Sequence, residues 1–533
     1  MTHHILVSDK LSENGLKVLR DAEGVEVNYA PGLEPAALKL AIQRADALII
    51  RSATTADSEL LAAAPRLRLI GRAGIGVDNV DVAAASRQGI VVMNTPHGNA
   101  VTAAEHAISL ICSLARNIPQ ATASMKAGKW EKSKFQGREL SEKTLGLVGL
   151  GNIGRIVAAR AQGLRMKVIA SDPMLTEEAA RKLGIELVEF ETLLKRADLI
   201  SIHTPLVAST HHMFNDAAFE QAKPGLLLVN AARGGIVDEA ALLRALESGR
   251  VAGAGLDVFE TEPVPTDHPL LAHPNVVCTP HLGASTTEAQ ERVAVEIAEQ
   301  TLAFLREGTV LNAINLPAVS PEAASKIAPY ARLARRLGSL LAQLEVKHPA
   351  VFRVVCRGEL PSSNARSLTF EALAGFLSVH ADSKVNAVRA PYEAKERGIE
   401  VLEVADQTPK RFTNALVVEI EFPGNKRRAI GSLDHEDQPR LTTLDNFDVD
   451  ALLDGHVMFL RNLDQPGVIG AVGSVLGQRN INISRMQVGL DPKTKQAIAF
   501  WNIDCALPNA TLEAIRGLPH VDAVNALALV DEA

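Results

Sequence analysis

The sequence predicts an α/β protein built on parallel β-sheets, and three observations lead to this fold class. Short apolar stretches typical of strands alternate with amphipathic stretches typical of helices from the amino terminus onward. A second series of the same kind begins after a long helical stretch. Aromatic residues make up only 4% of the chain, whereas Ala, Val, Leu and Ile are abundant, which suits helices packed on sheets. Two doubly wound parallel-sheet domains are therefore expected, with ligands at the carboxyl ends of their strands.

The first series predicts a sheet near the amino terminus. Strands are expected at residues 4–9, 25–30, 47–52, 67–74 and 90–96, with helices at 13–22 and 34–45. A long helix is then expected at 100–120. The second series places strands at the starts of 144–154, 167–172, 197–205, 225–235, 251–260 and 275–283, each ending in a small, glycine-bearing or polar turn. Such turns are typical of a cofactor crevice.

After this second series the chain is expected to return to the first unit. Ser285 with Glu288 three residues later has the capping-box spacing and predicts the start of a long helix. The strand-like stretch 310–315 follows that helix. We therefore expect a discontinuous flavodoxin-like substrate-binding domain at 1–98 and 285–317. A Rossmann NAD-binding domain at 99–284 is inserted into it.

Two further domains are expected after a linker near residue 318. The α/β alternation continues through residues 318–453, without a chemical motif, and indicates an intervening domain. From residue 454 to 533 the pattern becomes strand, helix, strand, strand, helix, strand. That βαββαβ order is typical of the ferredoxin-like split βαβ fold.

Composition excludes several classes of function. Hydrophobic residues make up 47% of the 533 residues and charged residues 22%, which is ordinary for a globular protein. A formal charge of −7 argues against nucleic acid as a partner. The chain start has no signal-peptide pattern, and no apolar stretch approaches membrane-spanning length, so a cytoplasmic location without a membrane partner is expected. The isolated cysteines predict reduced thiols and no metal site.

A glycine motif indicates the cofactor. Gly149, Gly151 and Gly154 have the G-x-G-x-x-G spacing, directly after an expected strand and before an expected helix. The motif alone is weak, but Asp172 ends the next expected strand, where a carboxylate binds ribose hydroxyls and repels a 2′-phosphate. Alone, Asp172 is more often a helix cap or turn residue. Together these features favour NAD over NADP.

Three polar residues end successive expected strands and match the chemistry of a 2-hydroxy acid. His281 titrates near neutral pH and suits proton transfer at the substrate oxygen. Glu262 can orient that imidazole and stabilise its charged form. Arg233, exposed between small residues, offers planar donors to a carboxylate. Taken alone, each of these three residues is more often an ordinary surface or loop residue. Together they predict the oxidation of a 2-hydroxy acid or the reduction of a 2-oxo acid.

The stretches "GRAGIGVDNVD", "MNTPHGNAVTAAEHA", "GLGNIGR", "NAARGGIVDE", "AGLDVFETEP" and "PHLGAS" closely resemble the D-2-hydroxyacid dehydrogenase family over about residues 50–315. The resemblance implies oxidation of 3-phospho-D-glycerate to 3-phosphohydroxypyruvate with NAD, the first step of L-serine biosynthesis. It implies Arg233, Glu262 and His281 as the catalytic set. It also implies a homo-oligomer, a dimer or tetramer, and a side activity on 2-oxoglutarate.

The resemblance assigns further residues. Besides the three glycines, it places the cofactor against Asn152, Ile153, Asp172, Thr204, Ala231, Ala232, Arg233, Asp257, His281, Gly283 and Ala284. Substrate binding is expected at Arg51, Ser52, Arg72, Asn99, Lys132 and Lys134. The two lysines belong to a basic segment that reaches a neighbouring subunit's site in relatives; an ordinary solvated loop is the alternative for them.

The last 80 residues resemble an ACT domain through "RNLDQPGVIGAVGSVLGQRNINISRMQVG". In this family such domains pair across subunits and bind serine as a feedback inhibitor. The implied effector contacts are Asn462, Asp464, Gly467 and Asn482, although Asn462 stands where some relatives have histidine. An ACT domain used only for assembly is the alternative, because fold alone does not confer function.

Two other functions stay open. One is a D-2-hydroxyacid dehydrogenase for lactate, glycerate or a bulkier acid, and the basic residues near the cleft argue against it. The other is a regulatory protein that senses NAD and has lost turnover; the intact set of Arg233, Glu262 and His281 argues against it.

Overall fold

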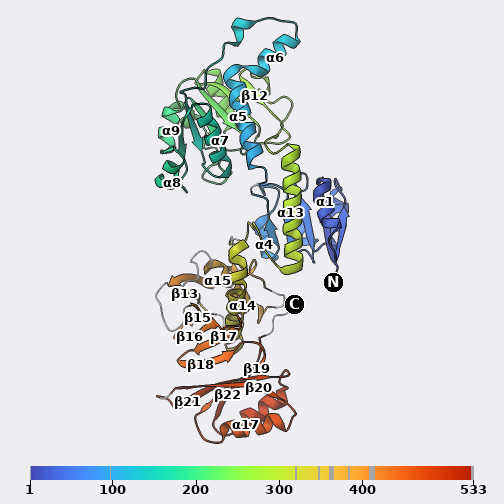
Figure 1. The fold of residues 1–533 in the computed structure, drawn as a ribbon, viewed down its shortest axis with the longest axis vertical. Coiled ribbons are helices and arrows are strands. Elements are labelled where there is room, and N and C mark those ends of the chain that lie inside the picture. Colours follow the sequence, from blue (N-terminus) through green and yellow to red (C-terminus); the bar gives the residue numbers. More distant parts are fainter. Residues whose placement is uncertain are drawn as a thin grey trace.

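A computed structural model describes residues 2–96, 98–317, 321–345, 349–358, 365–381, 385–406, 414–491 and 493–529. Over these ranges the chain forms four β-sheets with their helices, arranged one after another along an elongated molecule (Figure 1). The predicted α/β fold class is confirmed. Among the described helices none is long and apolar enough to cross a membrane.

The first sheet is five-stranded, parallel and ordered β2-β1-β3-β4-β5. Its strands are β1 His3–Val7, β2 Val25–Tyr29, β3 Ala47–Ile50, β4 Leu69–Arg72 and β5 Val91–Met93. Its helices are α1 Glu13–Arg20, α2 Pro35–Ala41, η1 Ile42–Arg44, α3 Ser58–Ala62 and α4 Val82–Arg87. This flavodoxin-like order reverses between β1 and β3, where the loops that follow the strands diverge and open a crevice.

The chain returns to this sheet after the second domain. Helix α13, Thr287–Glu307, packs on α1 so closely that a Cβ on Gly15 would lie 2.7 Å from the Cβ of Ala294. The expected strand at 310–315 is reduced to a single antiparallel bridge between Met93 and Ala313. The two ends of the inserted segment lie close together, because Nε of Arg292 in α13 donates to Gly98 O at 3.1 Å. Figure 1 shows α13 packed beside α1.

The predicted capping box at the start of α13 is wrong by one residue. Thr286 is the N-cap, and its hydroxyl accepts a hydrogen bond from Ala289 N at 3.2 Å. Ser285 instead donates its backbone N–H to Leu282 O at 2.8 Å, within the loop that carries His281. That turn uses Ser285, so the helix begins later and Glu288 is not at the capping-box position.

The second sheet is seven-stranded, parallel and ordered β12-β11-β10-β9-β6-β7-β8. Its strands are β6 Thr144–Val148, β7 Lys167–Ser171, β8 Glu186–Leu187, β9 Leu199–Ile202, β10 Leu226–Asn230, β11 Val251–Leu256 and β12 Val276–Cys278. Its helices are α7 Asn152–Gly163, α8 Glu177–Lys182, α9 Phe190–Arg196, α10 Asp216–Gln221, α11 Glu239–Glu247 and α12 Pro269–Ala272. The strand order reverses between β6 and β9, as in a dinucleotide-binding Rossmann fold.

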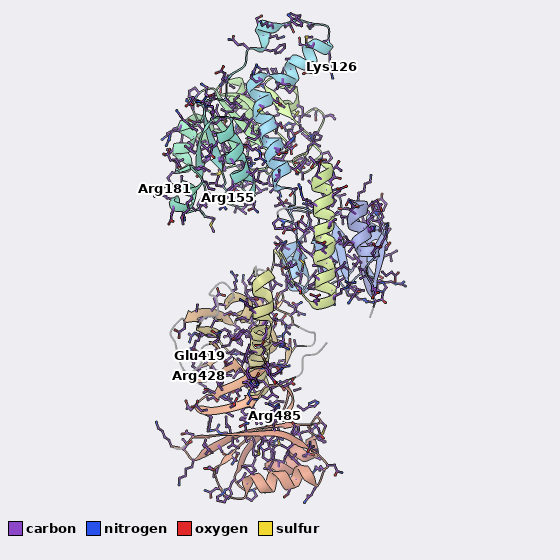
Figure 2. All side chains as sticks on the ribbon, viewed as in Figure 1. Lys126, Arg155, Arg181, Glu419, Arg428 and Arg485 are labelled. Atoms are coloured by element: carbon purple, nitrogen blue, oxygen red, sulfur yellow. The ribbon has the colours of Figure 1, made fainter. Side chains whose placement is uncertain are left out.

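The helix expected at 100–120 is broken in two. Helix α5, Ala100–Arg116, ends at Asn117, which has a left-handed φ of 52°. Helix α6, Ile118–Lys126, then leaves at a new angle with no buried residue. It projects from the second sheet, and Lys126 at its end lies at one extremity of the molecule (Figures 1 and 2).

The third sheet, ordered β14-β13-β15-β16-β17-β18, departs from the predicted alternation. The alternation holds for α14 Pro321–Leu344, β13 Val351–Gly358, α15 Ala365–Ser378, α16 Ala390–Glu396 and β14 Glu400–Asp406. Four strands then follow with no helix between them: β15 Asn414–Phe422, β16 Asn425–Leu433, β17 Pro439–Leu444 and β18 Phe447–Leu452. They pair antiparallel, because turns of two to five residues leave no room for a crossover helix.

The fourth sheet has the ferredoxin-like order β20-β21-β19-β22 that the sequence predicts. Its strands are β19 Gly455–Leu463, β20 Ile483–Asp491, β21 Gln496–Ile503 and β22 Val521–Leu529, and its helices are α17 Val468–Gly477 and α18 Asn509–Arg516. Trp501 and Met458 lie in the core under the helices. Phe459 and Phe500 face the other way and join the core of the third sheet, so the last two sheets pack directly together.

Candidate active site

A cleft of about 700 Å³ lies between the first two sheets. One wall comes from the first domain, from the ends of β3 and β4, and the other from the loops that follow β11 and β12. Six residues that the sequence predicts as catalytic or substrate-binding line it: Arg51, Ser52, Arg72, Asn99, Glu262 and His281.

Glu262 and His281 are in direct contact within this cleft. Oε2 of Glu262 lies 2.6 Å from Nδ1 of His281, and Oε1 accepts a hydrogen bond from Phe259 N at 3.0 Å. Both side chains stay partly exposed, 37% for Glu262 and 51% for His281. A carboxylate at Nδ1 keeps the proton on that nitrogen and leaves Nε2 available to a substrate. The pair can therefore serve as an oriented acid–base.

The loop that carries His281 is held by Asp257. One carboxylate oxygen accepts hydrogen bonds from Thr279 Oγ1 at 2.5 Å and Leu282 N at 2.7 Å, and the other accepts from Gly283 N at 2.8 Å. His106 Nε2 lies 3.1 Å from the first oxygen. Burial works to raise the pKa of Asp257, but these hydrogen bonds outweigh it and the pKa is lowered.

The hydrogen bonds of Asp257 stabilise a left-handed backbone conformation at His281. His281 has a φ of +53°, rare for a residue with a side chain, and donates its N–H to Asp257 O at 2.9 Å. The sequence analysis does not identify His106. The sequence gives little indication of this role, because a histidine in the middle of a helix can serve many purposes. Its partner, Asp257, is also 151 residues away in the chain.

Arg233 is not as free as its small neighbours suggest. Its Nε donates to Oδ2 of Asp78 at 2.8 Å, and its NH1 donates to Ala232 O at 2.7 Å. Asp78 belongs to the first domain, so this ion pair crosses between domains. Arg233 also lies near Arg72: burial and then Arg233 lower the pKa of Arg72 to about 10, and Asp78 partly offsets them. The sequence analysis does not identify Asp78.

The glycine motif fits a dinucleotide. Gly149 has a φ of +92°, and a Cβ there would lie 2.6 Å from His203 O. A Cβ on Gly154 would lie 2.3 Å from Gly149 O, so strand and helix approach closely. Gly151 is the N-cap of α7, and a Cβ on it would meet no atom within 4 Å. An open helix N-terminus of this kind suits a pyrophosphate. Asn152 and Ile153 form the first turn of α7.

The other predicted cofactor residues surround this loop. Asp172 follows β7, and its carboxylate accepts from Leu150 N at 2.8 Å and Met174 N at 2.9 Å, which holds it beside the glycine turn. Thr204 follows β9 next to His203, whose pKa burial lowers to about 4, so that imidazole is neutral at pH 7. Ala231 and Ala232 follow β10 directly, and Gly283 and Ala284 follow His281.

The predicted substrate residues of the first domain are positioned by Asp9. Its Oδ2 accepts from Arg51 N at 2.6 Å, Ala53 N at 3.2 Å and Thr54 N at 3.1 Å, which shapes the loop after β3. Asp9 ends the stretch "HILVSD", so its place at a strand end is visible in the sequence. Two buried atoms near this loop, Arg72 Nε and Asn99 Oδ1, have no hydrogen-bond partner among the described residues.

Lys132 and Lys134 do not reach this cleft. They lie on the short helix η2, Lys132–Phe135, in the projecting segment after α6, and Lys134 pairs with Glu131 at 3.7 Å. Neither residue lines the cleft. Within one chain the structure therefore does not bring them to the other substrate residues.

The predicted effector residues lie at two opposite ends of the fourth sheet. Asn462, Asp464 and Gly467 lie at the end of β19 and the start of α17, whereas Asn482 precedes β20, whose first residue pairs with Ile503 opposite the start of β19. Gly467 is the N-cap of α17 with a φ of +97°. Asp464 and Asn482 are exposed. Asn462 is only 5% exposed, and its side-chain amide donates to Leu463 O at 2.7 Å. Gly467, Asp464 and Asn482 are therefore open to a ligand, whereas Asn462 is turned into the protein.

Comparisons with known proteins agree with this architecture. Residues 108–283 match the model of the D-isomer specific 2-hydroxyacid dehydrogenase NAD binding domain. Residues 326–445 match the D-3-phosphoglycerate dehydrogenase intervening domain, and residues 456–520 match the ACT domain.

Curated relatives match over almost the whole chain. The D-3-phosphoglycerate dehydrogenase 2 of Arabidopsis thaliana is 43% identical over 97% of this chain and 85% of its own length. The D-3-phosphoglycerate dehydrogenase of Bacillus subtilis is 39% identical over 98% of this chain and 99% of its own length.

Solved structures match more than half of the chain. The TT0316 protein from Thermus thermophilus superposes with a TM-score of 0.54 and 37% identity, over 58% of this chain and 99% of that chain. A D-lactate dehydrogenase from Aquifex aeolicus, solved with NAD and lactic acid, gives a TM-score of 0.52 at 29% identity, over 58% and 98% of the two chains.

Proposed function

The chain belongs to the D-isomer-specific 2-hydroxyacid dehydrogenase family, in the long D-3-phosphoglycerate dehydrogenase form with an ACT domain, and from this premise we propose that it oxidises 3-phospho-D-glycerate to 3-phosphohydroxypyruvate. It is an oxidoreductase with NAD as cofactor. The cleft carries the proposal, because it joins the Glu262–His281 pair to Arg51 and Arg72 in one cavity.

In the proposed reaction His281 is the base. Oxidation removes a hydride from C2, which bound NAD accepts, and a proton from the C2 hydroxyl. His281 takes that proton at Nε2, because its Nδ1 faces the carboxylate of Glu262. Glu262 stabilises the imidazolium that results. The N-terminus of α7 would hold the pyrophosphate of NAD, and Asp172 would bind the adenosine ribose.

Positive charge and unsatisfied polar atoms are proposed to hold the substrate. Arg233 binds the carboxylate and the developing carbonyl oxygen, since guanidinium offers paired donors. Asn99 contacts the substrate with its buried, unpartnered Oδ1. Arg51 and Arg72 bind the phosphate, and Ser52 lies beside them in the cleft. Two arginines near the far end of a short substrate favour a second anionic group over the methyl group of lactate.

A substrate panel tests this function. We expect kcat/KM for 3-phosphoglycerate to exceed that for D-glycerate, D-lactate and D-2-hydroxyglutarate by at least about 100-fold, the size expected when charged partners in the site are left unpaired. Equal rates on all four acids would reject the phosphorylated substrate. Binding of NAD without turnover of any acid would instead favour the NAD-sensing alternative. The reverse assay with 2-oxoglutarate measures the proposed side activity.

We further propose that the enzyme opens L-serine biosynthesis and that serine inhibits it through the ACT domain. The open start of α17 at Gly467, with Asp464 exposed shortly before it in the chain, supports this. L-serine should lower the rate of the wild type and lose its effect in Gly467→Val, because a Cβ and two methyl groups block the approach to the helix. If serine has no effect on the wild type, a purely structural ACT domain is the better account.

The remaining assignments are part of the same proposal. They comprise a homo-oligomer in which Lys132 and Lys134 reach a neighbouring subunit's cleft, and the domain boundaries 1–98 with 285–317, 99–284, 318–453 and 454–533. A cytoplasmic location also belongs to it, supported by four cysteines that are free thiols. Lys134→Ala should raise KM for 3-phosphoglycerate only if the projecting segment after α6, which carries Lys132 and Lys134, enters another subunit's cleft.

A further inference from the structure

We infer that Asp78 is a positioning residue for Arg233: it reaches from the first domain to the second and holds the guanidinium in the orientation that binds the substrate carboxylate. The inference rests on the proposed role of Arg233. Arg233 lies in the loop after β10, and Asp78 lies in the loop after β4, 155 residues earlier in the chain. Nε of Arg233 donates to Oδ2 of Asp78 at 2.8 Å.

The guanidinium of Arg233 is fixed on three sides. Asp78 engages Nε, and the backbone carbonyl of Ala232 engages NH1 at 2.7 Å. The third nitrogen, NH2, rests on Gly76, where a Cβ would lie only 1.8 Å from it. The loop that carries Asp78 thus supplies both an acceptor and a backbone surface for one cation. Of these contacts, the Asp78 carboxylate is the one that a side-chain substitution can remove without displacing a backbone.

Asp78 can act as a fixed reference because its own loop is fixed. The side-chain amide of the next residue, Asn79, donates to Arg51 O at 2.8 Å and Thr54 O at 2.6 Å. The amide of Asn94 donates to Ile75 O at 2.5 Å. These bonds tie the loop after β4 to the loop after β3 and to the end of β5. The carboxylate itself is 66% exposed, so it has little role in the packing of its domain.

The negative charge of Asp78 also helps to keep Arg233 in place beside Arg72. Burial and, after it, repulsion by Arg233 lower the pKa of Arg72, and Asp78 opposes the effect of Arg233. Arg51 adds positive charge and Asp9 negative charge to the same surroundings. Without the carboxylate of Asp78, this repulsion would push Arg233 away from Arg72, but the effect is smaller than that of the lost hydrogen bond because the carboxylate is 66% exposed.

A double-mutant cycle tests the inference with 3-phosphoglycerate and NAD. We expect Asp78→Ala to lower kcat/KM by about 10- to 100-fold, the loss typical of a displaced positioning contact. Asp78→Asn keeps an acceptor for Nε and should stay within about fivefold of the wild type, since the charge of a half-exposed pair contributes little. In an Arg233→Ala background, Asp78→Ala should cost less than about twofold, because the residue it positions is already gone.

Glu59→Ala is the matched control. It removes an exposed carboxylate of the same domain, paired with Lys39 and absent from the cleft lining, and should leave kcat/KM unchanged. Affinity for NADH, measured by fluorescence, should be the same in the wild type, Asp78→Ala, Asp78→Asn and Glu59→Ala. Asp78→Ser repeats the cycle if the alanine variant does not fold.

The results distinguish a failure of the inference about Asp78 from a failure of the proposed role of Arg233. Wild-type activity in Asp78→Ala, or an equal loss in the wild-type and Arg233→Ala backgrounds, overturns the inference while the function of Arg233 stands. Wild-type activity in Arg233→Ala overturns the proposed role of Arg233 itself, and the inference with it.

Discussion

His281 and Glu262 meet through a contact of 2.6 Å between Nδ1 and Oε2, although 19 positions separate them in the chain. They follow the neighbouring parallel strands β12 and β11, which end at the same edge of the second sheet. His281 takes up a left-handed backbone to reach this position. Two residues with unremarkable neighbours in sequence thus become an oriented acid–base pair at the wall of a cleft.

Replacing His281 tests the proposed base. His281→Ala should lower kcat by roughly 10²- to 10⁴-fold, the usual loss when a general acid–base is removed. Affinity for NAD, measured by NADH fluorescence, should fall far less than kcat, because His281 is one of many assigned cofactor contacts and the glycine turn and Asp172 are left intact. His435→Ala, at an 88% exposed histidine of the third domain, is the control and should keep full activity. Full activity in His281→Ala would remove the residue from the mechanism.

Asp257 should stabilise the protein in a pH-dependent way. Its pKa in the folded state is below the ordinary 3.8, because its hydrogen bonds outweigh burial. The ionised carboxylate therefore contributes stability above about pH 4, and this contribution disappears as the pH falls through the lower folded value. Asp257→Asn should cost ~1–3 kcal/mol of unfolding free energy at pH 7, the usual penalty for broken buried hydrogen bonds.

Urea unfolding followed by circular dichroism at pH 7, 5 and 3.5 measures the effect. The difference between wild type and Asp257→Asn should stay constant from pH 7 to 5 and shrink at 3.5. Asp216→Asn, in an exposed pair with Arg244, should change little at any pH. A difference that grows on acidification would contradict the lowered pKa. Asp257→Asn should also lower kcat, since the His281 loop loses its anchor.

Asp172 should set the choice between NAD and NADP. Asp172→Ser removes the carboxylate that we propose binds the ribose hydroxyls, and we expect kcat/KM for NAD to fall about 10- to 100-fold, as for lost charged hydrogen bonds. Activity with NADP should rise, because the repulsion of a 2′-phosphate is gone. Steady-state kinetics with both cofactors measure the ratio. Glu186→Gln, on the adjacent strand and paired with Arg196, should leave it unchanged. An unaltered ratio in Asp172→Ser would mean that the carboxylate serves only the glycine turn.

Arg51 should discriminate phosphorylated from unphosphorylated substrate. Arg51→Gln should raise KM for 3-phosphoglycerate about tenfold or more, since a hydrogen bond to a charged group is lost. KM for D-glycerate, which lacks the phosphate, should hardly change. Arg66→Gln is the control, because Arg66 pairs with Asp46 in the same domain and is absent from the cleft lining. A similar rise in KM for both substrates would place Arg51 at the carboxylate instead.

Most elements of the fold were predictable because their signals are local. Apolar strands followed by glycine or polar turns identify both parallel sheets, and the βαββαβ order identifies the last domain. The errors lie where tertiary contacts compete with a local pattern. Ser285 has a capping-box spacing, but a turn with Leu282 takes its backbone N–H. The helix after residue 100 breaks at Asn117, whose left-handed backbone no periodicity reveals.

The sequence by itself determined the strands, the glycine turn, and the polar residue types that stand at strand ends, because these depend on neighbours in the chain. Only the tertiary structure decided which of those side chains meet. Strand order in the second sheet brings Glu262 to His281, and the packing of helix α5 on that sheet brings His106 to Asp257. The contact between the two domains brings Asp78 to Arg233. Such contacts join residues far apart in sequence, and the packing that creates them leaves no periodic trace in the chain.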